Sequence, residues 1–371
     1  MTGTLMPELF DSLTLRGLTL RNRIAVSPMC QYSATDGLAN DWHRTHLSSL
    51  ARGGAGLVTI EATGVTPEGR ITPGCLGLWN DAQAEALAPI VAEIGKSGAA
   101  SGIQLAHAGR KASANAPWEG DNHIPGNDPR GWQTIAPSAI AFGGDLPKIP
   151  REMTLDDIAR VQQGFVDAAL RANEIGLDSL MLHFAHGYLG QSFLSPHSNT
   201  RTDAYGGSAA NRARFLIETL AAVRKVWPEQ KPILARIGVI EFDGQDEETL
   251  GDAIDTIRSL KAEGLDLVDV SMGFSTPDAD IPWGPAFLAP IAGRVRQETG
   301  LPTSTSWYIS KPEQANQLIE DELVDLISLG RPMLTNPHWP YDAAQKLGVE
   351  NPAWATLPTP YAHWLQRYRA A

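Results

Sequence analysis

A short segment in the middle of the chain carries side chains that can transfer protons or bind a metal ion. His183 and His186 are three residues apart, and Tyr188 follows two residues later. Imidazole and phenol groups this close in sequence can orient a substrate oxygen, donate a proton or ligate a metal. A zinc site needs a third protein ligand, which His107 or Cys30 could supply. The spacing alone therefore leaves three interpretations open: a structural pair, a metal site and a substrate clamp.

Two arginines are placed where they could face an anionic ligand. Arg236 interrupts the apolar segment 232–238, and a buried guanidinium needs an anionic partner. That partner is either a structural carboxylate such as Glu61 or the electron-rich edge of a cofactor. Gly330 and Arg331 follow the last apolar segment, where barrel proteins commonly bind phosphate. The simpler alternative for this pair is a turn glycine beside a solvated arginine.

The elements that must position these residues alternate along the chain. Short segments, most of them rich in Val, Ile and Leu, predict strands that are buried on both faces, and the segment 302–307 is predicted mainly from its place in the order. They are 24–29, 56–63, 101–107, 177–184, 232–238, 265–271, 302–307 and 323–330. Segments with a period of 3.6 residues predict helices between them, including 82–96, 155–175, 208–226, 247–263, 285–299 and 312–320. Eight such alternations favour an α/β fold of the (β/α)₈ barrel type over an open, doubly wound sheet.

Two other segments stand outside this alternation. Residues 13–22 alternate apolar and polar side chains around a glycine and predict an N-terminal β-hairpin. Residues 108–150 show no period and hold many prolines and glycines, so they form either a disordered insertion or a lid after the third strand. Trp118 and Trp132 could give such a lid something to pack. Without a linker or a repeat, residues 1–371 are expected to form one domain.

Catalytic groups of a barrel collect at the carboxyl ends of its strands. The predicted ends bring a thiol, amides, imidazoles, phenols, an indole and guanidinium groups to one face. These residues lie at 27–32, 61–63, 104–110 and 183–188, at 236, and at 306–307 and 330–331.

The composition argues against several classes of function. The 371 residues carry a net charge of −12 and no polybasic segment, so neither nucleic acid nor an anionic membrane is an expected partner. No signal peptide is evident, and no apolar run approaches the ~18 residues of a membrane-spanning helix. Two cysteines, Cys30 and Cys75, are too few for a disulfide framework. We therefore expect a cytoplasmic protein with free thiols.

Several longer motifs occur together at these strand ends. They are PMCQY at 28–32, HFAHGYL at 183–189, RTDAYGGS at 201–208, SLGRPML at 328–334 and PYAHWLQRY at 360–368. In combination they resemble the old yellow enzyme family of FMN-dependent ene-reductases. The resemblance is to the subgroup that includes xenobiotic reductase A and the thermophilic-like, or YqjM-like, enzymes, and it covers nearly the whole chain.

The resemblance implies a reaction and a set of catalytic residues. FMN would bind noncovalently over the carboxyl mouth of a (β/α)₈ barrel and alternate between NADPH or NADH and an activated alkene in a ping-pong cycle. His183 and His186 would hydrogen-bond the carbonyl or nitro oxygen of the substrate, and Tyr188 would donate a proton. Cys30 would tune the flavin, and no metal is implied. Two rival hypotheses remain: a metal-dependent barrel hydrolase that uses His183 and His186, and a noncatalytic flavin- or phosphate-binding protein.

The same resemblance implies the contacts of both ligands. The cofactor-binding residues would be Ser27, Pro28, Met29, Cys30, Ala62, Gln104, Arg236, Ser306, Trp307, Gly330 and Arg331. The substrate pocket would be lined by Tyr32, Trp307 and Trp364. Because Trp364 would come from a neighbouring subunit, a homodimer or a dimer of dimers is expected. The loop 307–310 departs from the family pattern, since its sequence WYIS lacks the glycines expected beside a phosphate, and its conformation stays open.

Overall fold

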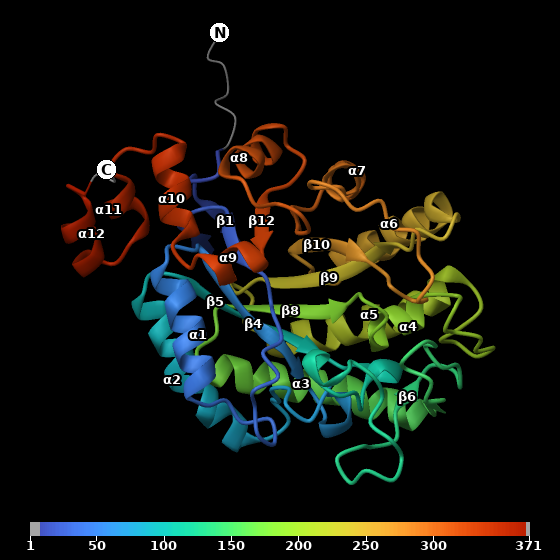
Figure 1. The fold of residues 1–371 in the computed structure, drawn as a ribbon. Coiled ribbons are helices and arrows are strands. Elements are labelled where there is room, and N and C mark those ends of the chain that lie inside the picture. The colour runs from blue at the N-terminus through green and yellow to red at the C-terminus, as the bar shows by residue number, and fades with distance from the viewer. Residues whose placement is uncertain (1–7, 369–371) are drawn as a thin grey trace.

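Eight parallel strands close into a barrel in the computed structural model, which describes residues 8–368 (Figure 1). Each strand pairs with the next one along the chain, and the last pairs back to the first. The barrel strands are β3 (Ile24–Val26), β4 (Leu57–Gly64), β5 (Ala100–Ala106), β8 (Ser179–Phe184), β9 (Ile233–Ile240), β10 (Leu267–Met272), β11 (Thr303–Thr305) and β12 (Leu326–Leu329). Each overlaps a predicted strand, so the predicted α/β barrel is confirmed.

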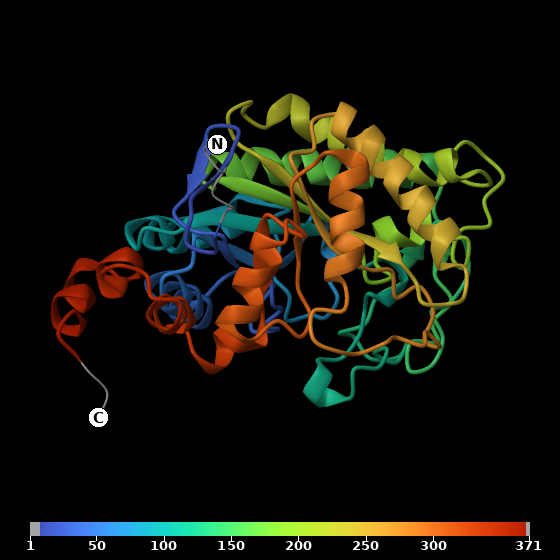
Figure 2. The same ribbon diagram turned by 90° about the horizontal axis from the view of Figure 1, so that it is seen from above.

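Helices surround the barrel (Figures 1 and 2). They are α1 (Asp41–Arg52), α2 (Asp81–Lys96), α3 (Leu155–Glu174), α4 (Leu189–Leu194), α5 (Ala209–Val226), α6 (Asp246–Ala262), α7 (Ala289–Thr299), α8 (Pro312–Glu320), α9 (Arg331–Thr335), α10 (Trp339–Lys346), α11 (Pro352–Thr356) and α12 (Thr359–Leu365). The last two of them, α11 and α12, project to one side of the barrel beyond α10 (Figures 1 and 2). The start of α3 shows why these helices begin where they do. Thr154 Oγ1 accepts from the Asp157 N–H at 3.1 Å, and the Asp157 carboxylate accepts from the Thr154 N–H at 2.9 Å.

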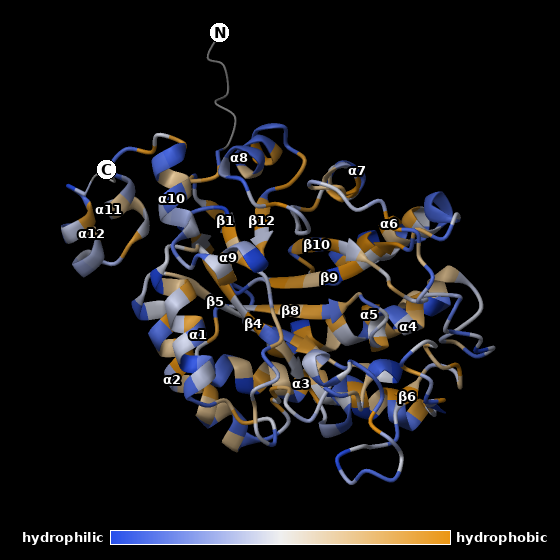
Figure 3. Cartoon of the chain, viewed as in Figure 1, coloured by the Kyte–Doolittle hydropathy of each residue, from blue (hydrophilic) through white to orange (hydrophobic). Residues whose placement is uncertain are grey.

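The core lies inside the barrel and between the barrel and its helices. Every residue of β4, β8, β9 and β10 is buried, as the unbroken apolar runs predict. The hydropathy colouring shows orange strands at the centre and blue on the outer sides of the helices (Figure 3). No helix among residues 8–368 has the length and apolar character needed to cross a bilayer.

The predicted N-terminal hairpin is confirmed and closes one end of the barrel. Its strands, β1 (Leu13–Leu15) and β2 (Leu18–Leu20), pair antiparallel. Leu13, Leu15 and Leu20 form one buried cluster with residues near the amino ends of the barrel strands. These residues are Ala25, Leu57, Met181, Leu234, Leu267 and Leu326. The hairpin therefore seals the amino end and leaves only the carboxyl end for a site.

The insertion after β5 is ordered, so the interpretation as a disordered segment is wrong. It contains η2 (Gly109–Lys111), η3 (Pro117–Glu119) and a short parallel pair of β6 (Ile135–Ala136) with β7 (Arg151–Glu152). Arg110 is almost fully buried and donates to the Ala141 carbonyl at 3.1 Å. Trp132 donates from Nε1 to the Glu68 carbonyl at 2.9 Å, whereas Trp118 is 69% exposed.

Candidate active site

The turn after β8 brings three predicted site residues together. The ring centroid of His183 lies 5.0 Å from that of His186 and 5.1 Å from that of Tyr188. The chain reverses through left-handed φ angles of 62° at His186 and 68° at Gly187. A Cβ on Gly187 would lie 2.3 Å from the Phe274 carbonyl oxygen, so this position requires glycine.

Burial sets the protonation states of this cluster. Burial, together with the charges of Arg236 and Lys111, lowers the pKa of His183 to about 3. The same causes hold the pKa of His186 well below its usual value. Burial raises the pKa of Tyr188 well above its usual value. Both imidazoles are therefore neutral and the phenol keeps its proton near neutral pH, so all three rings can act as hydrogen-bond donors.

The two imidazoles differ in their partners. His186 Nε2 lies 2.8 Å from Ser271 Oγ, which fixes the orientation of that ring. His183 Nδ1 is buried and has no hydrogen-bond partner within residues 8–368. An orphaned buried nitrogen of this kind indicates a site for a further polar group.

Arg236 pairs with a carboxylate that the sequence did not single out. It lies in register with His183 on one side and Asp269 on the other. Its Nε is 3.2 Å from Asp269 Oδ2, and its Nη2 donates to Ser306 Oγ at 2.7 Å. The suggestion of Glu61 as the structural partner is therefore wrong, because strand pairing puts Asp269 beside the guanidinium instead.

Glu61 supports the loop that carries Cys30. The β4–β5 register shifts at this residue, because Ile60 pairs with Ile103 and Ala62 with Gln104. Such bulges redirect a side chain. Glu61 Oε2 accepts from the Gln31 N–H at 2.9 Å, and its Oε1 lies 3.6 Å from His43 Nε2.

The carboxyl and the thiol are both neutral near neutral pH. Burial raises the pKa of Glu61 to about 8. Burial, and then the charge of Glu61, raises the pKa of Cys30 well above its usual value. Cys30 is therefore a thiol rather than a nucleophilic thiolate.

Aromatic rings form two walls at the mouth of the barrel. On one side the ring of Tyr32 meets that of Trp118 edge-on at 5.8 Å. On the other, Trp307 lies 6.2 Å from His186 and 5.9 Å from Phe274. The ring of Trp283, which is half exposed, lies tilted against that of Trp307, with the ring centroids 5.6 Å apart. Neither Phe274 nor Trp283 was predicted as a site residue. Both follow the predicted strand 265–271, so their position after the carboxyl end of a strand was the signal that could have indicated them.

The loop after β11 adopts the conformation that glycines would favour, but without glycines. Trp307 has a φ of 75° and Tyr308 a φ of 54°. Left-handed angles at two consecutive bulky residues are strained and mark a functional loop in many proteins. Trp307 Nε1 is buried and has no hydrogen-bond partner in the described part of the chain.

The first and last strands end close together. A Cβ on Gly330 would lie 3.5 Å from Met29 Sδ and 4.0 Å from Ser27 Cβ, and the Ser27 N–H donates to the Leu329 carbonyl at 2.9 Å. Arg331 opens α9 and is exposed.

Two more predicted side chains, Gln104 and Trp364, lie in different parts of the molecule. Gln104, beside Ala62 in the β4–β5 pair, is buried and donates to Met181 Sδ at 3.3 Å. Trp364 is 79% exposed on α12, at the edge of the molecule on the far side of the barrel from the insertion (Figures 1 and 2). The structure does not bring Trp364 to the mouth of its own barrel.

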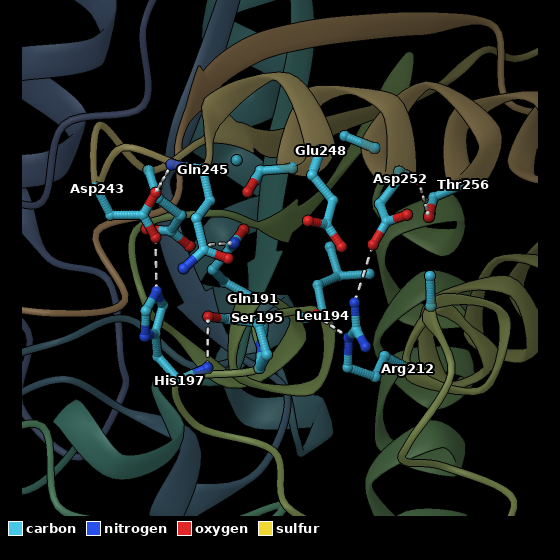
Figure 4. Close-up of a pocket in the computed structure, with 16 residues that line it drawn as sticks. Gln191, Leu194, Ser195, His197, Arg212, Asp243, Gln245, Glu248, Asp252 and Thr256 are labelled. Atoms are coloured by element: carbon cyan, nitrogen blue, oxygen red, sulfur yellow. Dashed lines mark hydrogen bonds and ion pairs between the residues drawn. The ribbon is translucent and has the colours of Figure 1, made fainter.

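A separate hollow outside the barrel lies between α6 and the α4–α5 region (Figure 4). Its charged side chains pair with one another: His197 Nε2 lies 2.6 Å from Asp243, and Arg212 Nη2 lies 2.9 Å from Asp252. None of the predicted site residues lines it, so it is distinct from the barrel mouth.

The metal hypothesis required a third ligand beside His183 and His186. Across residues 8–368, no group of three or more His, Cys, Asp or Glu side chains is arranged to hold a metal ion. Neither His107 nor Cys30 supplies that ligand.

Comparisons with known proteins agree with the resemblance seen in the sequence. Residues 8–350 match the NADH:flavin oxidoreductase / NADH oxidase family. NADPH dehydrogenase of Geobacillus thermodenitrificans is 44% identical over 344 residues, which span 92% of this chain and 95% of that protein. The structure of morphinone reductase is similar with a TM-score of 0.78 at 27% identity, over 94% of this chain and 92% of that one. The old yellow enzyme homologue from Zymomonas mobilis gives a TM-score of 0.75 at 26% identity, over 98% of this chain and 100% of that one. The chain therefore belongs to the NADH:flavin oxidoreductase / NADH oxidase family, the family of the old yellow enzymes.

Proposed function

We propose that this flavin oxidoreductase reduces activated carbon–carbon double bonds, such as those of α,β-unsaturated carbonyl compounds and nitro-alkenes. NADPH or NADH is the reductant, and FMN is a noncovalent cofactor. The observation that carries the proposal is the cluster of His183, His186 and Tyr188, in which two neutral imidazoles and a protonated phenol share one turn. The name of the relative, NADPH dehydrogenase, supports a nicotinamide nucleotide as one substrate.

The polar atoms left at the barrel mouth fit a flavin. Ser27 Oγ, His183 Nδ1 and Trp307 Nε1 are buried there and have no hydrogen-bond partner among the described residues. Since buried polar groups are nearly always paired, these atoms indicate a ligand rich in ring nitrogens and oxygens. FMN bound at this mouth would supply the hydride transfer that protein side chains cannot.

The residues that would hold FMN come from the ends of six strands. Arg236, which pairs with Asp269, would offer its guanidinium to the flavin ring. Backbone N–H groups at 306–307 and 330–331 would bind the phosphate. The full set is Ser27, Pro28, Met29, Cys30, Ala62, Gln104, Arg236, Ser306, Trp307, Gly330 and Arg331.

The protein's own part in the reaction is to polarise the substrate and deliver a proton. His183 and His186 each donate one N–H to the carbonyl or nitro oxygen, which stabilises the negative charge that develops there. Tyr188, held as a neutral phenol, donates its proton to the α-carbon. The rings of Tyr32 and Trp307 limit where a flat substrate can lie, and the Cys30 thiol adjusts the polarity beside the cofactor.

Replacing Tyr188 by Phe tests this function. Only the reaction with the alkene needs a proton from the protein, so Tyr188→Phe should slow that half of the cycle and spare the reaction with NADPH. Stopped-flow absorbance measures the two halves separately. Equal slowing of both halves would contradict the proton-donor role and indicate a structural tyrosine.

We further propose a homodimer, or a dimer of dimers, in which Trp364 helps to close the neighbour's substrate pocket. Its 79% exposure, with Trp354 and Tyr361 also exposed on the same C-terminal helices, supports an interface there. Deleting residues from Tyr361 onward should weaken assembly and alter substrate affinity together. A truncated protein with unchanged mass in solution and unchanged kinetics would overturn the shared site and leave the flavin chemistry untouched.

A further inference from the structure

We propose that Lys111 is a positioning residue that clamps together the two loops bearing His186 and Phe274. Lys111 ends η2, directly after β5, and its Nζ donates to the His186 carbonyl at 2.8 Å and to the Phe274 carbonyl at 3.1 Å. The inference rests on the proposed function, because it assigns Lys111 to the same site.

Both acceptors of the clamp lie at strained backbone positions. His186 has a φ of 62° and Phe274 a φ of 49°, which bulky residues avoid unless their surroundings impose it. A Cβ on the intervening Gly187 would come within 2.8 Å of Lys111 Nζ. The ammonium therefore fills the space between two tight turns and satisfies a carbonyl from each.

The clamp also joins the insertion to the site. Lys111 Nζ lies 3.9 Å from the ring centroid of Phe142 and 5.9 Å from that of Tyr188. A cation over an aromatic face is attracted to it, most strongly where water is excluded. One side chain of the insertion thus contacts the loops after β8 and β10 and a second residue of the insertion, Phe142.

Charges of both signs surround Lys111, and burial outweighs them. Burial and the neighbouring Arg110 lower its pKa to about 7, while Glu241 and Asp121 act in the opposite direction. The positive charge in turn contributes to keeping both histidines of the cluster neutral.

The clamp determines where the substrate-facing rings point. The ring of His186 is held by Ser271 Oγ at 2.8 Å, and its backbone is held by Lys111. Without Lys111, two carbonyls lose their donor and the turn from His186 to Tyr188 can relax. A displacement of about 1 Å at reacting groups can cost roughly a hundredfold in rate.

The experiment compares Lys111→Met with a matched control, Lys231→Met. Lys231 lies toward the opposite end of the barrel and makes a similar pair of bonds, to the Leu177 carbonyl at 2.7 Å and to Asn173 Oδ1 at 2.9 Å. Hydrogen–deuterium exchange of peptides covering 183–190 and 272–276 is measured in the flavin-free and the FMN-loaded protein. Affinity for para-hydroxybenzaldehyde, a phenol that needs no turnover, is measured by titration of the loaded protein.

We expect Lys111→Met to speed exchange in both peptides and to weaken the phenol about 10- to 100-fold, with the affinity for FMN unchanged. Lys231→Met should change neither the exchange of these peptides nor the affinity for the phenol. Lys111→Arg, which keeps the donors and the charge, should retain most of the affinity for the phenol. If Lys111→Met does not fold, Lys111→Gln, which keeps one donor, is measured in the same way. Exchange and phenol affinity that match the Lys231→Met control would overturn the clamp. A failure of the Tyr188→Phe test would instead remove the proposed reaction and leave the exchange result standing.

Discussion

The ion pair between Arg236 and Asp269 offers a sharp test of how burial governs this site. Asp269 is fully buried and its Oδ2 lies 3.2 Å from Arg236 Nε. Asp269→Asn keeps the shape of the side chain but removes the counter-charge. Breaking a buried pair from one side typically costs about 3–5 kcal/mol, because the remaining charge stays desolvated. That is a large part of a typical net stability of about 5–15 kcal/mol.

Urea denaturation of the flavin-free protein, followed by circular dichroism, measures this loss directly. The control is Glu247→Gln, the same chemical change at an arginine pair that is shorter, 2.7 Å, but exposed. Exposed pairs contribute little to stability, so the control should unfold like the unmodified protein. If Asp269→Asn unfolds no more readily than Glu247→Gln, the reasoning from burial is refuted.

Three further outcomes are expected. His183→Ala or His186→Ala should weaken phenol binding and raise the activation free energy of alkene reduction by about 3 kcal/mol while FMN stays bound. Undiminished rates with the alkene would contradict the role of these histidines in polarising the substrate. Cys30→Ser should shift the flavin potential and the substrate preference without abolishing turnover, whereas complete inactivity with FMN bound would indicate a covalent nucleophile. Because burial raises the folded-state pKa of Glu61 from 4.5 to about 8, its protonated form stabilises the fold at low pH, and that contribution is lost as the pH rises through about 8. Glu61→Gln should therefore flatten the fall in unfolding free energy between pH 5 and pH 9, and an unchanged pH profile would contradict the shift.

The barrel could be predicted from the sequence because its signal is local. Most of the buried strands are short runs of apolar residues, as β9 shows with its eight consecutive buried positions. The exception is β11, Thr303–Thr305, which only its place in the alternation predicts. Helix α1 was not among the predicted helices, because it is rich in polar and charged residues and buries few apolar side chains. Its buried residues Leu47, Leu50 and Ala51 do recur at helical spacing, so the helix packs through a narrow apolar stripe.

The site could be predicted only in part, because only some of its contacts join residues that are close in the sequence. His183, His186 and Tyr188 are close in sequence, so their proximity followed from one turn. The partner of Arg236 could not be predicted in this way, because the pairing depends on the register between two strands about thirty residues apart in the chain. The strained loop at Trp307 and the two contacts of Lys111 likewise arise from tertiary packing, which no local pattern encodes.

The hairpin that seals the amino end has a consequence for how the chain folds during synthesis. Leu13, Leu15 and Leu20 are synthesised long before Leu326 of the last barrel strand, which belongs to the same cluster. At roughly 5–20 residues per second, about 300 further residues take on the order of 15–60 s to be made. During that time the three leucines lack part of the surface that buries them in the folded protein. The complete cluster and the closed barrel both need β12, so neither can form before that strand has been made.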